Sequence, residues 1–266
     1  DYSMLAYKTK VDYSNCLDIM LNTKLNKHSI CTTKVDKLTG AIARQSYELW
    51  LKRGISMANH IVSSSRKVYS FGMEMGYVEY NPFSTFKCKT NKPRKVIWTR
   101  EQIKKLLDFC YSDFRYRSIG LIVQMSYEWC QRVGDMRLLK FESIDFNNGV
   151  LNLEQSKRGA SVSLPISEDL FEMLQEQKRD YDFQEYVAPV PKAIRSSYNP
   201  YTLHRLSIVA RQAIRLCGLP NELRIADLRR TGTTEMVEAG VSMGQIMSVT
   251  GHANPQSVKP YMKNTL

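Results

Sequence analysis

Apolar residues recur at helical spacing through the first third of the chain. Ile42, Leu49 and Trp50 share one stripe of a predicted helix, and Gly54 follows it as a C-capping residue. Similar stripes predict a helix before and a helix after this one. The three predicted helices cover about 11–25, 41–53 and 61–73. No stretch of this region has the alternation of a strand, so we expect a small helical bundle with Lys and Arg on its outer faces.

The second part of the chain mixes helical and strand patterns. Thr99 and Gln102 have the spacing of a capping box, and residues 117–130 are apolar on most sides, as in a buried helix. Residues 149–155 and 161–165 alternate with a period of two around a basic turn, which predicts a β-hairpin. Further helices are predicted over about 168–179, 201–216, 227–239 and 242–249.

A basic segment separates the two patterned blocks. Residues 86–95 contain five basic residues, a proline and no acidic residue, and they follow the turn signal Asn81-Pro82. We expect an interdomain linker able to lie along a phosphate backbone, although a solvated surface loop fits the same composition. The linker residues expected to contact DNA are Lys87, Lys89, Lys92, Arg94 and Lys95.

The predicted fold is mainly α with a small antiparallel β-sheet. A helical domain is expected over 1–85, the linker over 86–95, and an α+β domain over 96–266. The chain begins at Asp1 rather than Met, which suggests that it is part of a longer protein. It shows neither a signal peptide nor an apolar run long enough to cross a bilayer.

Charge narrows the choice of partner. The formal net charge is +12 and the isoelectric point is near 9.4. This excess indicates a polyanionic partner, with nucleic acid first and acidic membrane lipid as the alternative. The six cysteines are scattered without a metal-binding spacing, so we expect reduced thiols, no metal and a cytoplasmic location.

Four segments resemble those of the tyrosine recombinase family, more narrowly the integrases of temperate bacteriophages. Their order and spacing match the family, and Tyr261 stands nine residues after His252. The segments are Gln131-Arg-Val-Gly-Asp135, Glu154-Gln-Ser-Lys157, Ala226-Asp-Leu-Arg229, and Gly251-His252 with the later Tyr261. The resemblance covers 96–261, and the first domain resembles more loosely the family's helical core-binding domain.

The resemblance implies a DNA strand-cleaving enzyme. Tyr261 would attack a DNA phosphate while Arg132 and Arg229 neutralise it, since arginine donates paired hydrogen bonds and stays protonated. Spacing alone would not separate these arginines from Arg137 and Arg230, so the family pattern selects them. Most tyrosines are packing residues, and only its place after Gly-His distinguishes Tyr261.

The remaining site residues follow from the same resemblance. Lys157, at the tip of the hairpin, is the expected general acid for the leaving 5′-oxygen, and neighbouring Arg158 is expected to contact DNA. His252 would bind the phosphate or support the nucleophile, and Asp135 would orient Arg132 or a helix end. A Lys-Arg-Gly turn is also common as a plain solvated turn, and a lone His is often structural.

One position departs from the family. Where the family has the His of its His-x-x-Arg motif, this chain has Ala226. Alanine donates no hydrogen bond and moves no proton. Loss of one assisting group costs on the order of 10²-fold in rate, so we expect a slow enzyme rather than an inactive one.

The expected partners are double-stranded DNA sites, on which the family analogy implies a homotetramer with host DNA-bending or directionality factors. No cofactor is expected, and the resemblance implies a bacterial, possibly phage-encoded protein in the cytoplasm or nucleoid. Family members often have an N-terminal arm-binding domain, which we expect to have been removed here. Two other functions fit less well: a non-catalytic DNA-binding regulator that kept the fold, which Ala226 favours, and a type IB topoisomerase.

Overall fold

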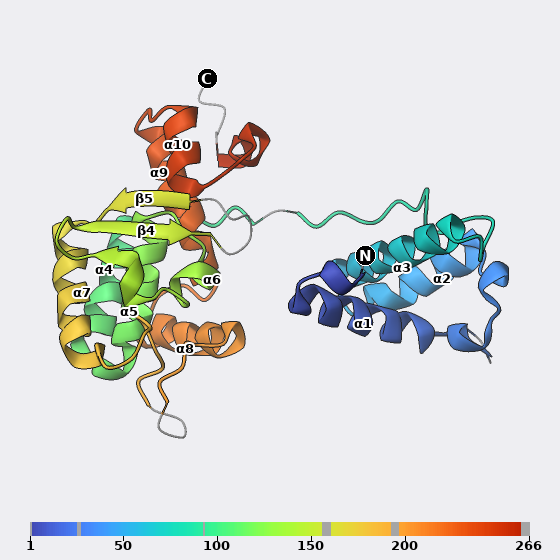
Figure 1. The fold of residues 1–266 in the computed structure, drawn as a ribbon, viewed down its shortest axis with the longest axis horizontal. Coiled ribbons are helices and arrows are strands. Elements are labelled where there is room, and N and C mark those ends of the chain that lie inside the picture. The colour runs from blue at the N-terminus through green and yellow to red at the C-terminus, as the bar shows by residue number, and fades with distance from the viewer. Residues whose placement is uncertain (1, 26–27, 93, 156–160, 193–196, 262–266) are drawn as a thin grey trace. The chain divides into compact units, whose positions relative to one another are not determined.

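The chain forms two compact units. The computed structural model describes residues 2–25, 28–92, 94–155, 161–192 and 197–261. Unit 1 comprises residues 1–94 and unit 2 residues 95–266, and each has its own hydrophobic core (Figure 1). No helix within the described residues is long and apolar enough to cross a membrane.

Unit 1 is built from three helices and a very short hairpin. The helices are α1 Tyr7–Leu21, α2 Gly40–Leu51 and α3 Ile55–Glu74. Strands β1 Lys24–Leu25 and β2 His28–Ser29 pair antiparallel between α1 and α2. The expectation of no strand in this region was therefore wrong, because strands of two residues are too short to show an alternating pattern.

The largest fully buried side chains in the core of unit 1 are aromatic. Tyr47, Trp50 and Phe83 are almost fully buried together with aliphatic residues of α3. The indole N–H of Trp50 donates to Thr23 Oγ1 at 2.7 Å, which satisfies its one polar group. The helical bundle expected from the periodicity is confirmed.

The first part of the basic segment is packed on unit 1. The Lys89 backbone N–H donates to Tyr47 Oη at 2.7 Å, and Asn59 Nδ2 donates to the Lys89 carbonyl at 2.8 Å. Phe86 meets Tyr47 edge-on, with ring centroids 5.0 Å apart. The backbone around Lys89 is thus held in place while the side chains of Lys87 and Lys89 stay exposed.

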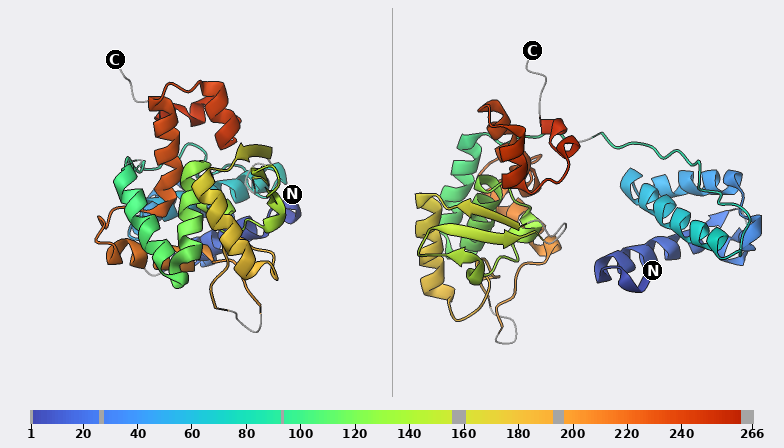
Figure 2. Two further views of the ribbon diagram at one scale, coloured as in Figure 1. Left: turned by 90° about the vertical axis from the view of Figure 1, so that its left-hand side faces the viewer. Right: turned by 45° about the horizontal axis from the view of Figure 1, so that its top comes forward.

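Unit 2 combines seven α-helices with a three-stranded antiparallel sheet in the described residues. The helices are α4 Arg100–Ser112, α5 Phe114–Glu128, α6 Val133–Met136, α7 Glu168–Tyr181, α8 Leu203–Leu216, α9 Leu228–Glu238 and α10 Met243–Thr250. The strands, in sheet order, are β3 Ile144–Asp145, β4 Val150–Glu154 and β5 Ser161–Pro165. Figures 1 and 2 show the sheet on one side of α4 and α5, with α8 on the other.

Local sequence accounts for these elements. Thr99 and Gln102 form the predicted capping box of α4, and Ser242 and Gln245 form another at α10. In the hairpin, Leu151 faces Leu164, and both are buried, as the alternation predicts. Helix α5 is buried along most of its length, so the expected buried helix is confirmed. The short elements α6 and β3 were not expected.

Candidate active site

Arg229 occupies the first turn of α9 and is 9% exposed. Its Nη2 donates to the Thr250 carbonyl at 2.7 Å and lies 3.1 Å from Nε2 of His252. Its Nη1 is buried and has no hydrogen-bond partner among the described residues. Buried donors are almost always paired, so Nη1 is a donor available to an anion.

The charge of Arg229 is affected by its surroundings. Burial, with a contribution from the Arg132 cation, lowers the pKa of Arg229 to about 10. The guanidinium therefore remains protonated at neutral pH. Two cations held this close in a partly buried place repel each other, and a bound phosphate would relieve the repulsion.

Arg132 lies at the N-terminal end of α6, after a sharp bend in the chain. Cys130 has a φ of 50°, in the left-handed region that residues other than glycine rarely adopt. Arg132 Nη1 donates to Gln155 Oε1 at 2.8 Å and lies 3.7 Å from Asp135 Oδ2. Asp135 lies within ion-pair distance of Arg132 but beyond hydrogen-bond distance, and its orienting role stays a prediction.

Two buried glutamines join the elements that carry the arginines. Gln131 and Gln155 are both fully buried, and Gln155 Nε2 donates to Gln131 Oε1 at 2.6 Å. Gln155 Nε2 also donates to the Thr250 carbonyl at 2.9 Å, the same oxygen that accepts from Arg229. No role for Gln155 was predicted from the sequence. The only available signal was that each glutamine stands within two residues of a predicted site residue.

The hydrogen bonds of His252 indicate its tautomer. Thr250 Oγ1 gives its single proton to the Ile246 carbonyl at 2.6 Å, so it can only accept from His252 Nδ1 at 2.7 Å. The proton of neutral His252 therefore lies on Nδ1. Nε2 is then left as an acceptor, facing Nη2 of Arg229 at 3.1 Å.

Tyr261 ends the short 3₁₀ helix Lys259–Tyr261. Its half-buried ring lies 6.2 Å from the His252 ring between centroids, and the Arg230 guanidinium lies 5.1 Å from the centroid of the Tyr261 ring. Proline disfavours helical backbone at the residue before it, yet Lys259, Pro260 and Tyr261 belong to one helical turn.

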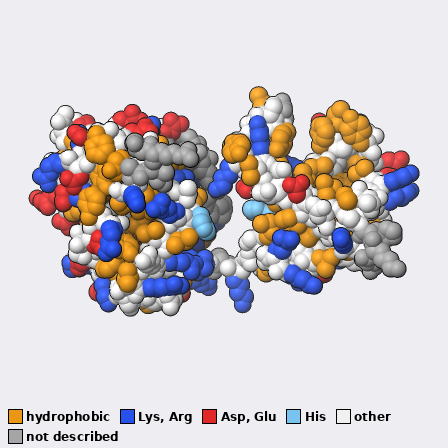
Figure 3. Space-filling model, turned by 90° about the horizontal axis from the view of Figure 1, so that it is seen from below, with side chains coloured by type: hydrophobic (Ala, Val, Ile, Leu, Met, Phe, Trp, Pro, Cys, Tyr) orange, Lys and Arg blue, Asp and Glu red, His pale blue; other side chains and the backbone are white. Residues whose placement is uncertain are grey.

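A cavity of about 510 Å³ adjoins the arginines. Arg132 and Arg229 line it, with Ala226 at an exposed position on its wall. Arg211 of α8 and Arg224 add positive charge, while apolar residues of α8 form much of the remaining wall. Figure 3, which views unit 2 from the side of α8, shows Lys and Arg side chains gathered on this face.

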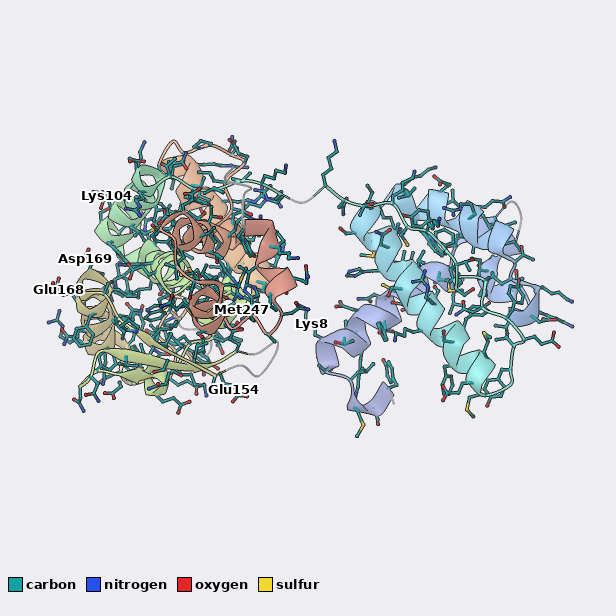
Figure 4. All side chains as sticks on the ribbon, turned by 90° about the horizontal axis from the view of Figure 1, so that it is seen from above. Lys8, Lys104, Glu154, Glu168, Asp169 and Met247 are labelled. Atoms are coloured by element: carbon teal, nitrogen blue, oxygen red, sulfur yellow. The ribbon has the colours of Figure 1, made fainter. Side chains whose placement is uncertain are left out.

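Several predicted site residues lie elsewhere. Lys157 and Arg158 fall outside the described residues. Glu154, the last residue of β4, lies at the edge of unit 2 (Figure 4). Lys92 and Lys95 are exposed and Arg94 is half-buried. Within the described residues, no group of three or more His, Cys, Asp or Glu side chains is placed to hold a metal ion.

The sequence is similar to those of known proteins. The chain is 26% identical over 170 residues to the tyrosine recombinase XerA of Pyrococcus furiosus, which covers 63% of this chain and 57% of that protein. It is 19% identical over 270 residues to a tyrosine recombinase of Pseudothermotoga lettingae, covering 98% and 87%. The chain thus spans little more than half the length of the Pyrococcus relative.

Solved structures share the fold. A lambda integrase dimer bound to a COC′ core site is similar with a TM-score of 0.77 at 17% identity, covering 98% of this chain and 90% of that one. The Tn1549 transposon integrase in complex with circular intermediate DNA gives 0.76 at 16% identity, covering 99% and 92%. The mainly helical fold with a small antiparallel sheet is confirmed. The family model described as the phage integrase family matches residues 97–266, and the chain belongs to that family.

Proposed function

We propose that the chain is a site-specific DNA recombinase. It breaks and rejoins DNA strands through a 3′-phosphotyrosyl intermediate, without metal or ATP. Tyr261 is the nucleophile, Arg132 and Arg229 neutralise the phosphate, and His252 supports the phosphate or the nucleophile. Lys157 is the general acid.

The buried donor of Arg229 is the observation that carries this proposal. Nη2 is occupied by Thr250 and His252, whereas Nη1 has no partner among the described residues. A phosphate oxygen accepting from Nη1 would satisfy it, and the transition state would gain most because negative charge builds on the non-bridging oxygens. Arg137 also has one buried donor, Nε, without a partner among the described residues, but only Arg229 combines such a donor with a place beside His252 and on the cavity that Arg132 lines.

The chemistry conserves the energy of the phosphodiester bond. The Tyr261 oxygen forms a bond to phosphorus, and the bond from phosphorus to the 5′-oxygen breaks. The phenolic proton passes to solvent water, and the 5′-oxygen takes a proton from Lys157. Attack by a 5′-hydroxyl of the second strand reverses these steps, so the exchange needs no external energy source.

The proposed substrate is double-stranded DNA carrying recombination sites. Among structures with the same fold, lambda integrase is described as a dimer bound to a core site and as a tetramer bound to a Holliday junction. We propose a homotetramer of this chain on DNA, and contacts from the basic segment 86–95 and from Arg158 to the phosphate backbone. A net charge of +12 favours such contacts.

Covalent capture tests the proposal. Duplexes enriched for binding from a randomised pool are rebuilt as a set with one nick at successive positions, so that a cleaved short fragment diffuses away. The wild-type protein should form an adduct resistant to SDS, and Tyr261→Phe should form none. Tyr198→Phe, a matched change in the aromatic cluster of Tyr181 and Phe183, should keep the adduct. No adduct, or one that survives Tyr261→Phe, would refute the assignment.

Ala226 supports one other function, a DNA-binding regulator without catalysis. Such a protein would bind the enriched duplexes with full affinity and form no adduct at any nick position. Relaxation of plasmids without a preferred sequence would instead indicate a topoisomerase.

A further inference from the structure

The side-chain amide of Gln155 is fully used in hydrogen bonding. Its Oε1 accepts from Arg132 Nη1 at 2.8 Å. Its Nε2 donates to Gln131 Oε1 at 2.6 Å and to the Thr250 carbonyl at 2.9 Å. A primary amide has two N–H donors, so both are occupied, and the side chain is 0% exposed. Gln155 therefore has a single well-defined position.

The orientation of this amide follows from its neighbours. Gln131 Nε2 lies 2.8 Å from the Trp129 carbonyl and 2.7 Å from the Val249 carbonyl, and two carbonyls can only accept. The side-chain oxygen of Gln131 must therefore face Gln155, and Gln155 must donate to it through its side-chain nitrogen. The oxygen of Gln155 is then the atom that faces Arg132.

Gly251 makes room for this amide. A Cβ at Gly251 would lie 2.5 to 2.7 Å from the nitrogen, carbon and oxygen of the Gln155 amide. Gly251 also has a φ of 65°, which ends α10 and turns the chain toward His252. The end of α10 thus lies directly against the Gln155 side chain, with no room for a Cβ between them.

We propose that Gln155 is a positioning residue for both arginines; this inference rests on the proposed recombinase function. It holds Arg132 directly through Oε1. It holds Arg229 through the Thr250 carbonyl, which accepts from Gln155 Nε2 and from Arg229 Nη2. One side chain thereby fixes the spacing of the two cations relative to each other and to the strand that leads to Lys157.

Removal of the amide should displace the Arg132 guanidinium. Its remaining described partner is Asp135 Oδ2 at 3.7 Å, and the guanidinium would shift toward that carboxylate. A displacement of about 1 Å in a reacting group can cost on the order of 10²-fold in rate. Binding of DNA depends on many phosphate contacts and should change much less.

Unit 2 contains a matched control in Gln177. It too is 0% exposed, its Oε1 accepts from Arg117 Nε at 2.8 Å, and its Nε2 donates to the Val187 carbonyl at 2.8 Å. It joins an arginine to a backbone carbonyl as Gln155 does. Its arginine pairs with Glu176 and Asp180 on α7, away from the candidate active site.

The first experiment compares Gln155→Met with Gln177→Met. Both replace a buried amide by a side chain of similar length, so both should lower the urea midpoint to a similar extent. Only Gln155→Met should slow adduct formation on the nicked duplexes, by about 10²-fold in single turnover, with DNA affinity within about threefold of wild type.

A second variant separates positioning from structural damage. In Gln155→Glu the ionised carboxylate can accept from Arg132 but cannot donate to Gln131 or to the Thr250 carbonyl. The protonated acid regains one donor. The rate of Gln155→Glu, divided by the wild-type rate at the same pH, should therefore rise as the pH falls.

The outcomes distinguish a failure of the recombinase function from a failure of the positioning role of Gln155. Wild-type protein that forms no adduct removes the recombinase function, and the role of Gln155 falls with it. Wild-type adduct with equal rates for Gln155→Met and Gln177→Met overturns the positioning role alone. A flat rate ratio for Gln155→Glu across pH, with Gln155→Met as fast as wild type, would do the same.

Discussion

Ala226 leaves space at the position where a side chain that assists DNA cleavage is expected. Ala226 is exposed on the wall of the cavity that Arg132 and Arg229 line. We expect Ala226→His to speed adduct formation by about 10²-fold, because an imidazole there can donate to the phosphate and exchange a proton. Ala226→Phe fills similar space without a nitrogen and should not accelerate cleavage. Equal rates for His and Phe would contradict this explanation of the gap.

Arg229 depends on the geometry of its guanidinium as well as on its charge. Lysine keeps the charge but cannot reach Thr250, His252 and a phosphate together. Arg229→Lys should therefore lower the single-turnover cleavage rate by about 10²- to 10³-fold. Arg215→Lys, an exposed change at the end of α8, provides the control and should cleave at the wild-type rate. A fully active Arg229→Lys would show that charge alone is sufficient.

At the scale of elements, two features of the backbone and packing require a glycine at the C-terminal end of α10. Gly251 has φ 65° and contacts Gln155, whereas Gly240, which follows α9, has φ 76° and nothing within 4 Å of its Cβ position. Gly240→Ala should cost only the left-handed strain, about 1 kcal/mol. Gly251→Ala should cost about 1–3 kcal/mol more, since the Gln155 amide must move.

Urea unfolding of the two alanine variants measures this difference. Gly251→Ala should also slow adduct formation, since displacement of Gln155 disturbs Arg132, and Gly240→Ala should not. Equal urea midpoints for the two variants would mean that the Gln155 amide moves aside without lowering the free energy of unfolding.

Local sequence predicted the long elements and missed the short ones. Helices α4, α5 and α7 carry caps or an apolar face over three or more turns, so periodicity and capping are sufficient to find them. The two-residue strands β1 and β3 exist only because a partner strand pairs with them. Each partner strand lies only a few residues further along the chain, but two residues are too few to show the alternation by which a strand is predicted.

The candidate site, too, was predicted from the sequence only in part. The family pattern in the sequence indicated Arg132, Arg229, His252 and Tyr261, and the structure places hydrogen bonds or ring contacts among them and their neighbours. The bridging role of Gln155 was not predictable, because it depends on a carbonyl 95 residues away in the chain. Buried polar networks of this kind are defined by packing, not by spacing.

At the scale of the whole molecule, buried tyrosines make the fold sensitive to alkali. Burial raises the pKa of Tyr69 in unit 1 and of Tyr201 in unit 2, each to about 12. An unfolded tyrosine loses its proton near pH 10, so between about pH 10 and 12 the unfolded chain binds fewer protons than the folded one. The free energy of unfolding should therefore fall as the pH rises through this window.

Substitution checks the source of this sensitivity. Tyr69→Phe should lose some stability at neutral pH, since its hydroxyl donates to the Val35 carbonyl at 3.2 Å. Between about pH 10 and 12, the free energy of unfolding of Tyr69→Phe should fall less than that of the wild type, as measured by urea unfolding. Tyr77→Phe, at an exposed position, should follow the wild-type curve. Parallel curves for Tyr69→Phe and wild type would exclude Tyr69 as a cause.

Charge is distributed unevenly over unit 2, and DNA binding should reflect that. In the view of Figure 4, Lys104, which pairs with Asp108, is on the same side of unit 2 as Glu168 and Asp169, and Met247 and Glu154 are on the other side. Exposed Arg211, by contrast, lines the cavity beside the two site arginines. Phosphate should therefore meet the α8 side and avoid the edge of Lys104.

Salt dependence tests this distribution. With several phosphate contacts, affinity for the enriched duplexes should fall about 10³-fold or more between roughly 50 and 200 mM salt. Arg211→Gln should weaken binding across sequences and reduce the slope of log affinity against log salt by about one. Lys104→Gln removes the same charge and should leave the slope unchanged. A flat dependence for the wild type would exclude DNA as the ligand, and equal slopes for the two variants would place the phosphates elsewhere on the surface.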